Sequence, residues 1–188
     1  MTYDTYMKTE PLRYERSVTF GRFNIAHQGH VQLIQLMLKH GEVANVCVSA
    51  GSGNNDWDLR VQLLRHLCRL SDINLRRVNF FKCANPFEAV DGAIRNAAYG
   101  EVAAVFGSDQ EVMARKLADV YDTAVILNRR TNSSTQMRFF LDAEDFIEDL
   151  RHLYQGDEFA VTLAKVLRQE ELYREKSSKV TTKVAAAA

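Results

Sequence analysis

Five short apolar segments alternate with longer segments whose apolar residues recur at helical spacing, and this alternation limits the folds open to the chain. The short segments have the β-branched and aromatic content of buried strands. In the longer ones apolar residues lie three and four positions apart, as in Val31, Ile34 and Leu38. This pattern is typical of a doubly wound, Rossmann-like α/β fold, a parallel sheet covered on both faces by helices. We therefore predict strands near 17–21, 43–50, 77–83, 102–107 and 123–127, and helices near 29–40, 57–70, 86–98 and 109–118.

Polar and glycine-containing segments follow four of these predicted strands. His27 and His30 come after the first strand, residues 49–53 after the second, 107–109 after the fourth and 129–135 after the fifth. Right-handed crossovers place the ligand crevice of such a sheet at the carboxyl ends of its strands. We expect these segments to meet there and to form one site.

The first of these segments, GRFNIAHQGH at residues 21–30, lies where a predicted strand leads into a helix. A helix N-terminus attracts anions through its unpaired backbone N–H groups and its dipole. His27 and His30 add donors that become cationic near neutral pH. Gly29 between them leaves no side chain in the way, so the segment predicts a phosphate-binding site.

This segment resembles the HxGH signature of the nucleotidyltransferase superfamily, α/β enzymes that transfer a nucleoside monophosphate from ATP or CTP to a phosphorylated acceptor. SSTQMR at 133–138 resembles the second signature of that superfamily, SSTxxR, which begins another helix and binds the triphosphate. The GRF sequence at 21–23 and the arginine pair at 129–130 are most similar to archaeal-type nicotinamide-mononucleotide adenylyltransferases. The resemblance covers residues 17–155 and implies the strand order 3-2-1-4-5.

The reaction that this resemblance implies is in-line attack by an acceptor phosphate oxygen on the α-phosphorus, with pyrophosphate leaving. Both reactants are anionic, so the enzyme acts by holding them together and neutralising developing charge. The expected catalytic residues are His27 and His30, at the α- and β-phosphates, and Arg138, at the triphosphate. A magnesium ion carried with ATP is the expected cofactor, and we assign it no protein ligand.

Further residues are expected to bind the two substrates through arginine forks, hydroxyl groups and backbone N–H groups. The candidates for nucleotide binding are Gly21, Arg22, Phe23, Gly29, Gly107, Asp109, Arg129, Ser133, Ser134 and Thr135. The candidates for binding the acceptor are Ser49, Gly51, Trp57 and Arg130.

Ordinary structural roles compete with these assignments. Ser-Ser-Thr before a helix is commonly an N-cap, and Arg138 would then be a solvated helix residue. A histidine near a helix start is more often a capping or surface residue than a catalytic one. Asp109 equally fits the cap of a strand-to-helix turn. For Trp57, packing is favoured over stacking on a nicotinamide ring.

The acceptor is the least constrained part of the assignment. After the second predicted strand the chain passes directly through residues 56–60, without the histidine and proline-containing turn of archaeal-type enzymes, and Ile25 replaces a common proline. Transfer of AMP from ATP to nicotinamide or nicotinate mononucleotide is our first expectation. The alternatives are cytidylyl transfer, another phosphorylated acceptor, or a non-catalytic binding or structural protein that keeps the fold within a larger assembly, a viral one included.

Charge and cysteine content bear on partners and location. With 24 basic and 24 acidic residues the chain has no net charge, which does not favour a nucleic-acid or membrane-surface protein. No apolar run reaches membrane-spanning length and no signal segment is evident, so we expect a cytoplasmic protein. Cys47, Cys68 and Cys83 lack a CxxC spacing and are expected to be buried, reduced thiols. The sequence does not determine the oligomeric state, and it is compatible with a homo-oligomer.

The length of 188 residues suits one compact domain. We expect an N-terminal arm at 1–16, the nucleotidyltransferase α/β domain at 17–141, a small helical subdomain at 142–175 and a flexible tail at 176–188.

Overall fold

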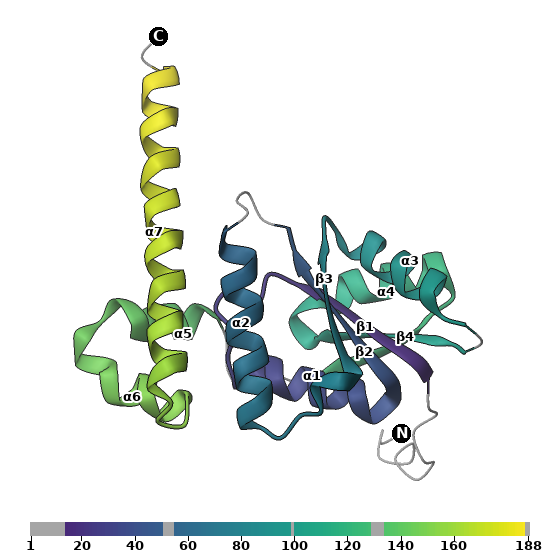
Figure 1. Cartoon of the computed structure of the whole chain (residues 1–188). Coiled ribbons are helices and arrows are strands. Elements are labelled where there is room, and N and C mark those ends of the chain that lie inside the picture. Colours follow the sequence, from purple (N-terminus) through teal and green to yellow (C-terminus); the bar gives the residue numbers. More distant parts are fainter. Residues whose placement is uncertain (1–13, 51–54, 99, 129–133, 187–188) are drawn as a thin grey trace, which may run out of the picture.

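A five-stranded parallel sheet forms the centre of the molecule (Figure 1). The computed structural model describes residues 14–50, 55–98, 100–128 and 134–186. The strands are β1 (Tyr14–Gly21), β2 (Gly41–Ser49), β3 (Val78–Cys83), β4 (Val102–Gly107) and β5 (Ala124–Asn128). Their order is β3-β2-β1-β4-β5 and every pairing is parallel. The predicted doubly wound α/β fold and its strand order are confirmed.

Helices cover both faces of the sheet and create two apolar cores. One face carries α1 (Gln28–His40) and α2 (Asn55–Leu70). Beyond α2 lie α5 (Ser134–Asp142), α6 (Ile147–Leu153) and α7 (Glu158–Ala186), which pack on one another and extend the same apolar core (Figure 1). The other face carries α3 (Pro86–Asn96) and α4 (Glu111–Tyr121). Successive side chains of a strand point to opposite faces, so Val46 and Val48 enter the first core whereas Cys47 enters the second. Short 3-10 turns lie at Leu75–Arg77, Ser108–Gln110 and Glu144–Phe146.

The ends of the chain differ from expectation. β1 begins at Tyr14, within the predicted arm, because Glu15 ties this strand to the segment before β4. The Glu15 N–H donates to the Glu101 carbonyl at 3.0 Å, and its carboxylate accepts from the N–H groups of Ala98 and Gly100. The tail predicted to be flexible from residue 176 is instead helical through Ala186. No glycine or proline interrupts residues 158–186, so nothing in the sequence stops the helix.

Two further features concern the sequence predictions. Cys47, Cys68 and Cys83 are free and buried, as predicted. Among the described residues no group of three or more His, Cys, Asp or Glu side chains is placed to bind a metal. Within the same residues, no helix has the length and apolar character needed to cross a membrane. The division of the chain into arm, domain and subdomain stays a prediction.

Candidate active site

The predicted phosphate segment forms the turn between β1 and α1, and its two histidines cap the helix. Nδ1 of His27 accepts from the N–H of Gly29 at 3.1 Å, and Nδ1 of His30 accepts from the N–H of His27 at 3.3 Å. This reciprocal arrangement is a capping box in which histidines take both side-chain roles. The two rings are buried, with centroids 4.0 Å apart.

Capping and phosphate binding use different nitrogens of these rings. Because Nδ1 of each ring accepts from the backbone, the proton of a neutral ring lies on Nε2, which is then the donor. The competing capping role predicted for a histidine at a helix start is therefore present in His27. It leaves the donor role of Nε2 in place, so the two interpretations are compatible.

The β1–α1 turn that precedes the histidines is held by packing and by a hydrogen bond from the C-terminal helices. Phe23 has a φ of 50°, in the left-handed region, and its buried ring lies 4.9 Å from the His30 ring. A Cβ at Gly21 would lie 3.2 Å from the Phe23 ring, so that position favours glycine. The hydroxyl of the buried Tyr154, between α6 and α7, donates to the Ala26 carbonyl at 2.9 Å. Tyr154 thus links the C-terminal helices to the turn that carries the histidines.

A cavity of about 300 Å³, which we name the β1/β4 cavity, gathers most of the described nucleotide candidates. Its lining residues come from the turns after β1 and β4 and from α5. They are Gly21, Arg22, Phe23, Asn24, His30, Asp109, Gln110 and Arg138. Sequence segments about a hundred residues apart therefore meet at the strand carboxyl ends, as predicted for this topology. Asp109 caps neither the 3-10 turn, which starts after Gly107, nor α4, so the capping alternative was wrong.

Arg138 is fixed at the wall of this cavity. Its Nη2 donates to the Asn24 carbonyl at 2.8 Å, and its Nε lies 3.0 Å from Oε2 of Glu171 on α7. The side chain is 25% exposed. The alternative that Arg138 is a solvated helix residue is therefore wrong, because the side chain bridges the β1–α1 turn and α7.

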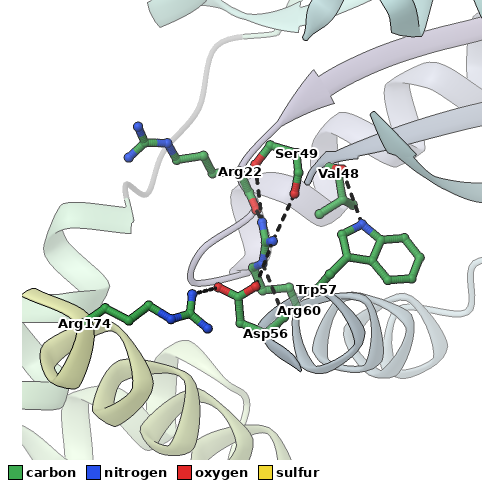
Figure 2. Close-up of polar contacts among 7 residues, drawn as sticks. All are labelled: Arg22, Val48, Ser49, Asp56, Trp57, Arg60 and Arg174. Carbon is green, nitrogen blue, oxygen red and sulfur yellow. Dashed lines mark hydrogen bonds and ion pairs between the residues drawn. The ribbon is translucent and has the colours of Figure 1, made fainter. Parts of the chain in front are cut away.

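Arg60, which no sequence motif singled out, organises the neighbouring part of the site (Figure 2). Its buried guanidinium donates to the Arg22 carbonyl at 2.6 Å, the Ser49 carbonyl at 3.0 Å and Oδ1 of Asp56 at 3.1 Å. Burial lowers the pKa of Arg60 and the Asp56 carboxylate opposes that effect. The other carboxylate oxygen of Asp56 accepts from Arg174 of α7. A detectable signal existed, because Arg60 shares the apolar face of α2 with Leu63, Leu64 and Leu67.

This cluster borders a second cavity of about 340 Å³, which we name the α2/α7 cavity. Its lining residues are Arg22, Asn24, Ser49, Asp56, Arg60, Glu171, Arg174 and Glu175. Arg22 and Asn24 also line the β1/β4 cavity, so the two cavities are neighbours. Figure 2 shows the exposed Arg22 guanidinium pointing away from the Arg60 cluster, where it can meet a ligand.

Of the acceptor candidates, Ser49 lines the α2/α7 cavity, and its hydroxyl accepts from Arg60 at 3.4 Å. Trp57 lines neither cavity: its Nε1 donates to the Val48 carbonyl at 3.3 Å and its ring packs against the first core. Packing is therefore its observed role. Gly51, Arg129, Arg130 and Ser133 lie outside the described residues, as do the side chains of Ser134 and Thr135. The backbone confirms that this second motif begins a helix at Ser134.

Comparison with solved structures finds the same architecture in adenylyltransferases. A bifunctional NMN adenylyltransferase/ADP ribose pyrophosphatase from Francisella tularensis matches over 90% of this chain with a TM-score of 0.61 and 16% identity. The same protein complexed with AMP and a manganese ion matches with a TM-score of 0.57 and 17% identity. Nicotinic acid mononucleotide adenylyltransferase from Plasmodium falciparum, complexed with APC, matches over 78% of this chain and 92% of its own, with a TM-score of 0.59 and 11% identity.

These likenesses establish the fold. This chain spans 56–57% of the Francisella chains. No protein-family model matches the sequence, and no curated protein does either.

Proposed function

We propose that the protein is a nucleotidyltransferase that moves AMP from ATP to a phosphorylated acceptor, with nicotinamide or nicotinate mononucleotide as the preferred acceptor. One observation carries the proposal. His30, Arg22 and Arg138 line a single cavity at the N-terminus of α1, where the backbone also favours anions. Packing alone does not require three cationic or protonatable side chains around one cavity. The likeness to adenylyltransferases of known structure supports the same class of reaction.

The reaction is an in-line displacement at the α-phosphorus. A bond forms between an acceptor phosphate oxygen and the α-phosphorus, and the bond from that phosphorus to the bridging oxygen of the β-phosphate breaks. Pyrophosphate leaves with the electron pair. The acceptor phosphate is already ionised at neutral pH, since its second pKa is about 6, so no general base is required. Positioning and charge stabilisation then account for the catalysis.

The described residues divide this work. The Nε2–H group of His30, which lines the β1/β4 cavity, donates to phosphate oxygens as charge develops on them. His27 is buried and lines neither cavity, so its contact with a phosphate stays a prediction. Arg138 donates to the triphosphate and Arg22, between the two cavities, to the phosphates that react. The roles of Arg129, Ser133, Ser134 and Thr135 remain predictions.

Magnesium fits this site as an ion carried by the nucleotide. Mg²⁺ is commonly held by substrate phosphates, water and one or two carboxylates. Asp109 supplies the carboxylate among the residues that line the β1/β4 cavity. When bound, the ion neutralises phosphate charge, which is compatible with the cationic side chains already present.

The α2/α7 cavity is the proposed acceptor site. Arg22 and Asn24 line both this cavity and the β1/β4 cavity. An acceptor phosphate in the α2/α7 cavity is therefore adjacent to the α-phosphorus of a nucleotide bound in the β1/β4 cavity. Ser49 and Arg174 offer a hydroxyl and a guanidinium toward a mononucleotide. This assignment replaces Trp57 as an acceptor contact.

The test is pyrophosphate release with ATP and Mg²⁺ against nicotinamide mononucleotide, nicotinate mononucleotide and other phosphorylated acceptors, with CTP as the alternative donor. Turnover with ATP and a pyridine mononucleotide is expected. Turnover only with CTP, or only with another acceptor, would contradict the preferred substrates but keep the reaction class. No turnover and no ATP binding would reject the reaction class and favour a non-catalytic protein.

A further inference from the structure

The C-terminal helix α7 contributes side chains to the candidate active site, although its contact residues lie 30 and more positions beyond the second motif. Glu171, Arg174 and Glu175 line the α2/α7 cavity. Figure 1 shows α7 lying beside α2, and the two helices pack together. Of the contacts that α7 makes, the one between Glu171 and Arg138 touches a residue of the proposed machinery directly.

Two groups from different elements orient the Arg138 guanidinium. Glu171 accepts from Nε at 3.0 Å, and the Asn24 carbonyl accepts from Nη2 at 2.8 Å. Two hydrogen bonds in different directions define the plane of a guanidinium, whose donors are fixed relative to one another. In the described part of the chain no protein group accepts from Nη1, which leaves that nitrogen for a ligand in the β1/β4 cavity.

Glu171 is itself held in place. The oxygen that contacts Arg138 also accepts from Nη1 of Arg168 at 2.7 Å. Arg168 in turn makes a bidentate pair with Asp142, the last residue of α5, at 2.9 and 2.7 Å. Arg168 lowers the pKa of Asp142, as expected for a charge-assisted pair. The contacts close a ring from α5 to α7 and back to α5.

A second contact fixes the position of α7 one turn further along. Arg174 pairs with Asp56 at the start of α2, and Asp56 also binds the buried Arg60 (Figure 2). Glu171 is therefore not a flexible surface side chain. Its helix is held against α2 by Arg174, its carboxylate accepts from Arg168, and its side chain is 20% exposed.

We propose that Glu171 is a positioning residue that holds Arg138 with Nη1 directed at the triphosphate of the bound nucleotide. An arginine side chain has several rotatable bonds, and ordering it only when substrate binds would cost conformational entropy. A carboxylate that orders it beforehand makes the charge stabilisation preorganised. The inference rests on the proposed function, because it takes the phosphates of ATP to be the group that Arg138 binds.

The test is a double-mutant cycle of wild type, Glu171→Ala, Arg138→Ala and the double variant. Each protein is assayed for pyrophosphate release and, by calorimetry, for ATP binding in Mg²⁺. Glu171→Ala is expected to lower kcat about 10- to 100-fold, because a small misplacement of a catalytic group has that effect. The kcat and the affinity for ATP are the readouts that report on Arg138, because Arg138 lines the β1/β4 cavity. The KM for the acceptor is not such a readout, because Glu171 itself lines the α2/α7 cavity.

The result that decides the proposal is whether the activity losses of the two single variants add in the double variant. In the Arg138→Ala background, Glu171→Ala should cause no further loss, because Glu171 acts through Arg138. Glu171→Gln keeps an oxygen that accepts from Nε and should retain more activity than Glu171→Ala. Glu170→Gln is the matched control, because this neighbouring glutamate is exposed and lines neither cavity. Thermal unfolding of each variant separates lost activity from lost folding.

Several outcomes would overturn the proposal. Equal losses from Glu171→Ala in both backgrounds would show a role independent of Arg138. Tighter ATP binding or faster turnover in Glu171→Ala would make Glu171 a brake instead. If wild type binds ATP without turnover, the proposed function fails while the ATP-binding cycle still decides the role of Glu171. If wild type binds no ATP, both proposals fail.

Discussion

Arg60→Met tests whether one buried guanidinium holds the candidate site together. Methionine is a good helix former of similar length, so the change removes the charge and the donors with little effect on the helix. The carbonyls of Arg22 and Ser49 and one oxygen of Asp56 lose the donor that they share. Breaking a buried ion pair by removing one partner costs about 3–5 kcal/mol.

The structure places the expected loss at the lower end of that range. Asp56 keeps its second partner, Arg174, and the adjoining cavity admits water to the stranded carbonyls. We therefore expect a loss of about 3 kcal/mol in the free energy of unfolding. For a chain of this length that corresponds to a fall in Tm of about 6–12 °C.

The measurement is urea unfolding followed by circular dichroism, with thermal unfolding as a second readout. Arg69→Met, at an exposed position on the same helix, is the matched control and should change stability by less than about 0.5 kcal/mol. Asp56→Asn, alone and combined with Arg60→Met, measures the coupling between the pair. Losses below about 1 kcal/mol in Arg60→Met, or equal losses in the two methionine variants, would refute the structural role assigned to Arg60.

Three further predictions concern catalysis, packing and pH. His30→Ala should lower the rate of pyrophosphate release about 10²- to 10³-fold with circular dichroism unchanged, and an unaltered rate would contradict the donor role. Gly41→Ala should destabilise the protein by about 1–3 kcal/mol in urea unfolding, because its Cβ would lie 2.7 Å from the backbone nitrogen of Ser17. Gly92 lies in α3, and a Cβ there would meet nothing within 4 Å, so Gly92→Ala should stabilise the protein by about 0.5–1 kcal/mol. If Gly41→Ala and Gly92→Ala changed stability in the same direction, that result would contradict this geometry. Burial raises the pKa of the Cys68 thiol from 9.0 to about 12. The contribution of this thiol to the free energy of unfolding is therefore complete below pH 9 and is lost as the pH rises toward 12. In unfolding measured at alkaline pH, Cys68→Ala should show a smaller loss of stability than wild type.

Local features of the sequence were enough to predict the architecture. Buried strands in a parallel sheet are nearly continuous apolar runs, and their order followed from the resemblance carried by the two motifs. The sequence did not predict the start of β1, because Tyr14, Glu15 and Arg16 are not an apolar run. Their pairing depends on contacts with β2 and with Ala98, Gly100 and Glu101. Charged residues at a strand end carry no strand signal of their own.

The candidate site was predictable in part for the same reason. The His27 and His30 capping geometry is local, and the meeting of the β1 and β4 turns follows from the topology. Trp57 was less certain, since only its contact with Val48 decides between packing and stacking.

The sequence by itself determined the types of elements, the doubly wound sheet and the edge where the candidate site lies, because periodicity and motif spacing are properties of nearby residues. Only the tertiary structure added Arg60, Glu171 and Arg174 to the charged side chains that the sequence had already assigned to the site. Arg60 meets Arg22 across 38 positions, Arg138 meets Glu171 across 33 and Arg174 meets Asp56 across 118. On an isolated helix Glu171 and Arg174 are indistinguishable from solvated surface charges. They acquire defined partners only when α7 packs against α2 and α5, since that packing removes water and brings opposite charges within hydrogen-bond distance.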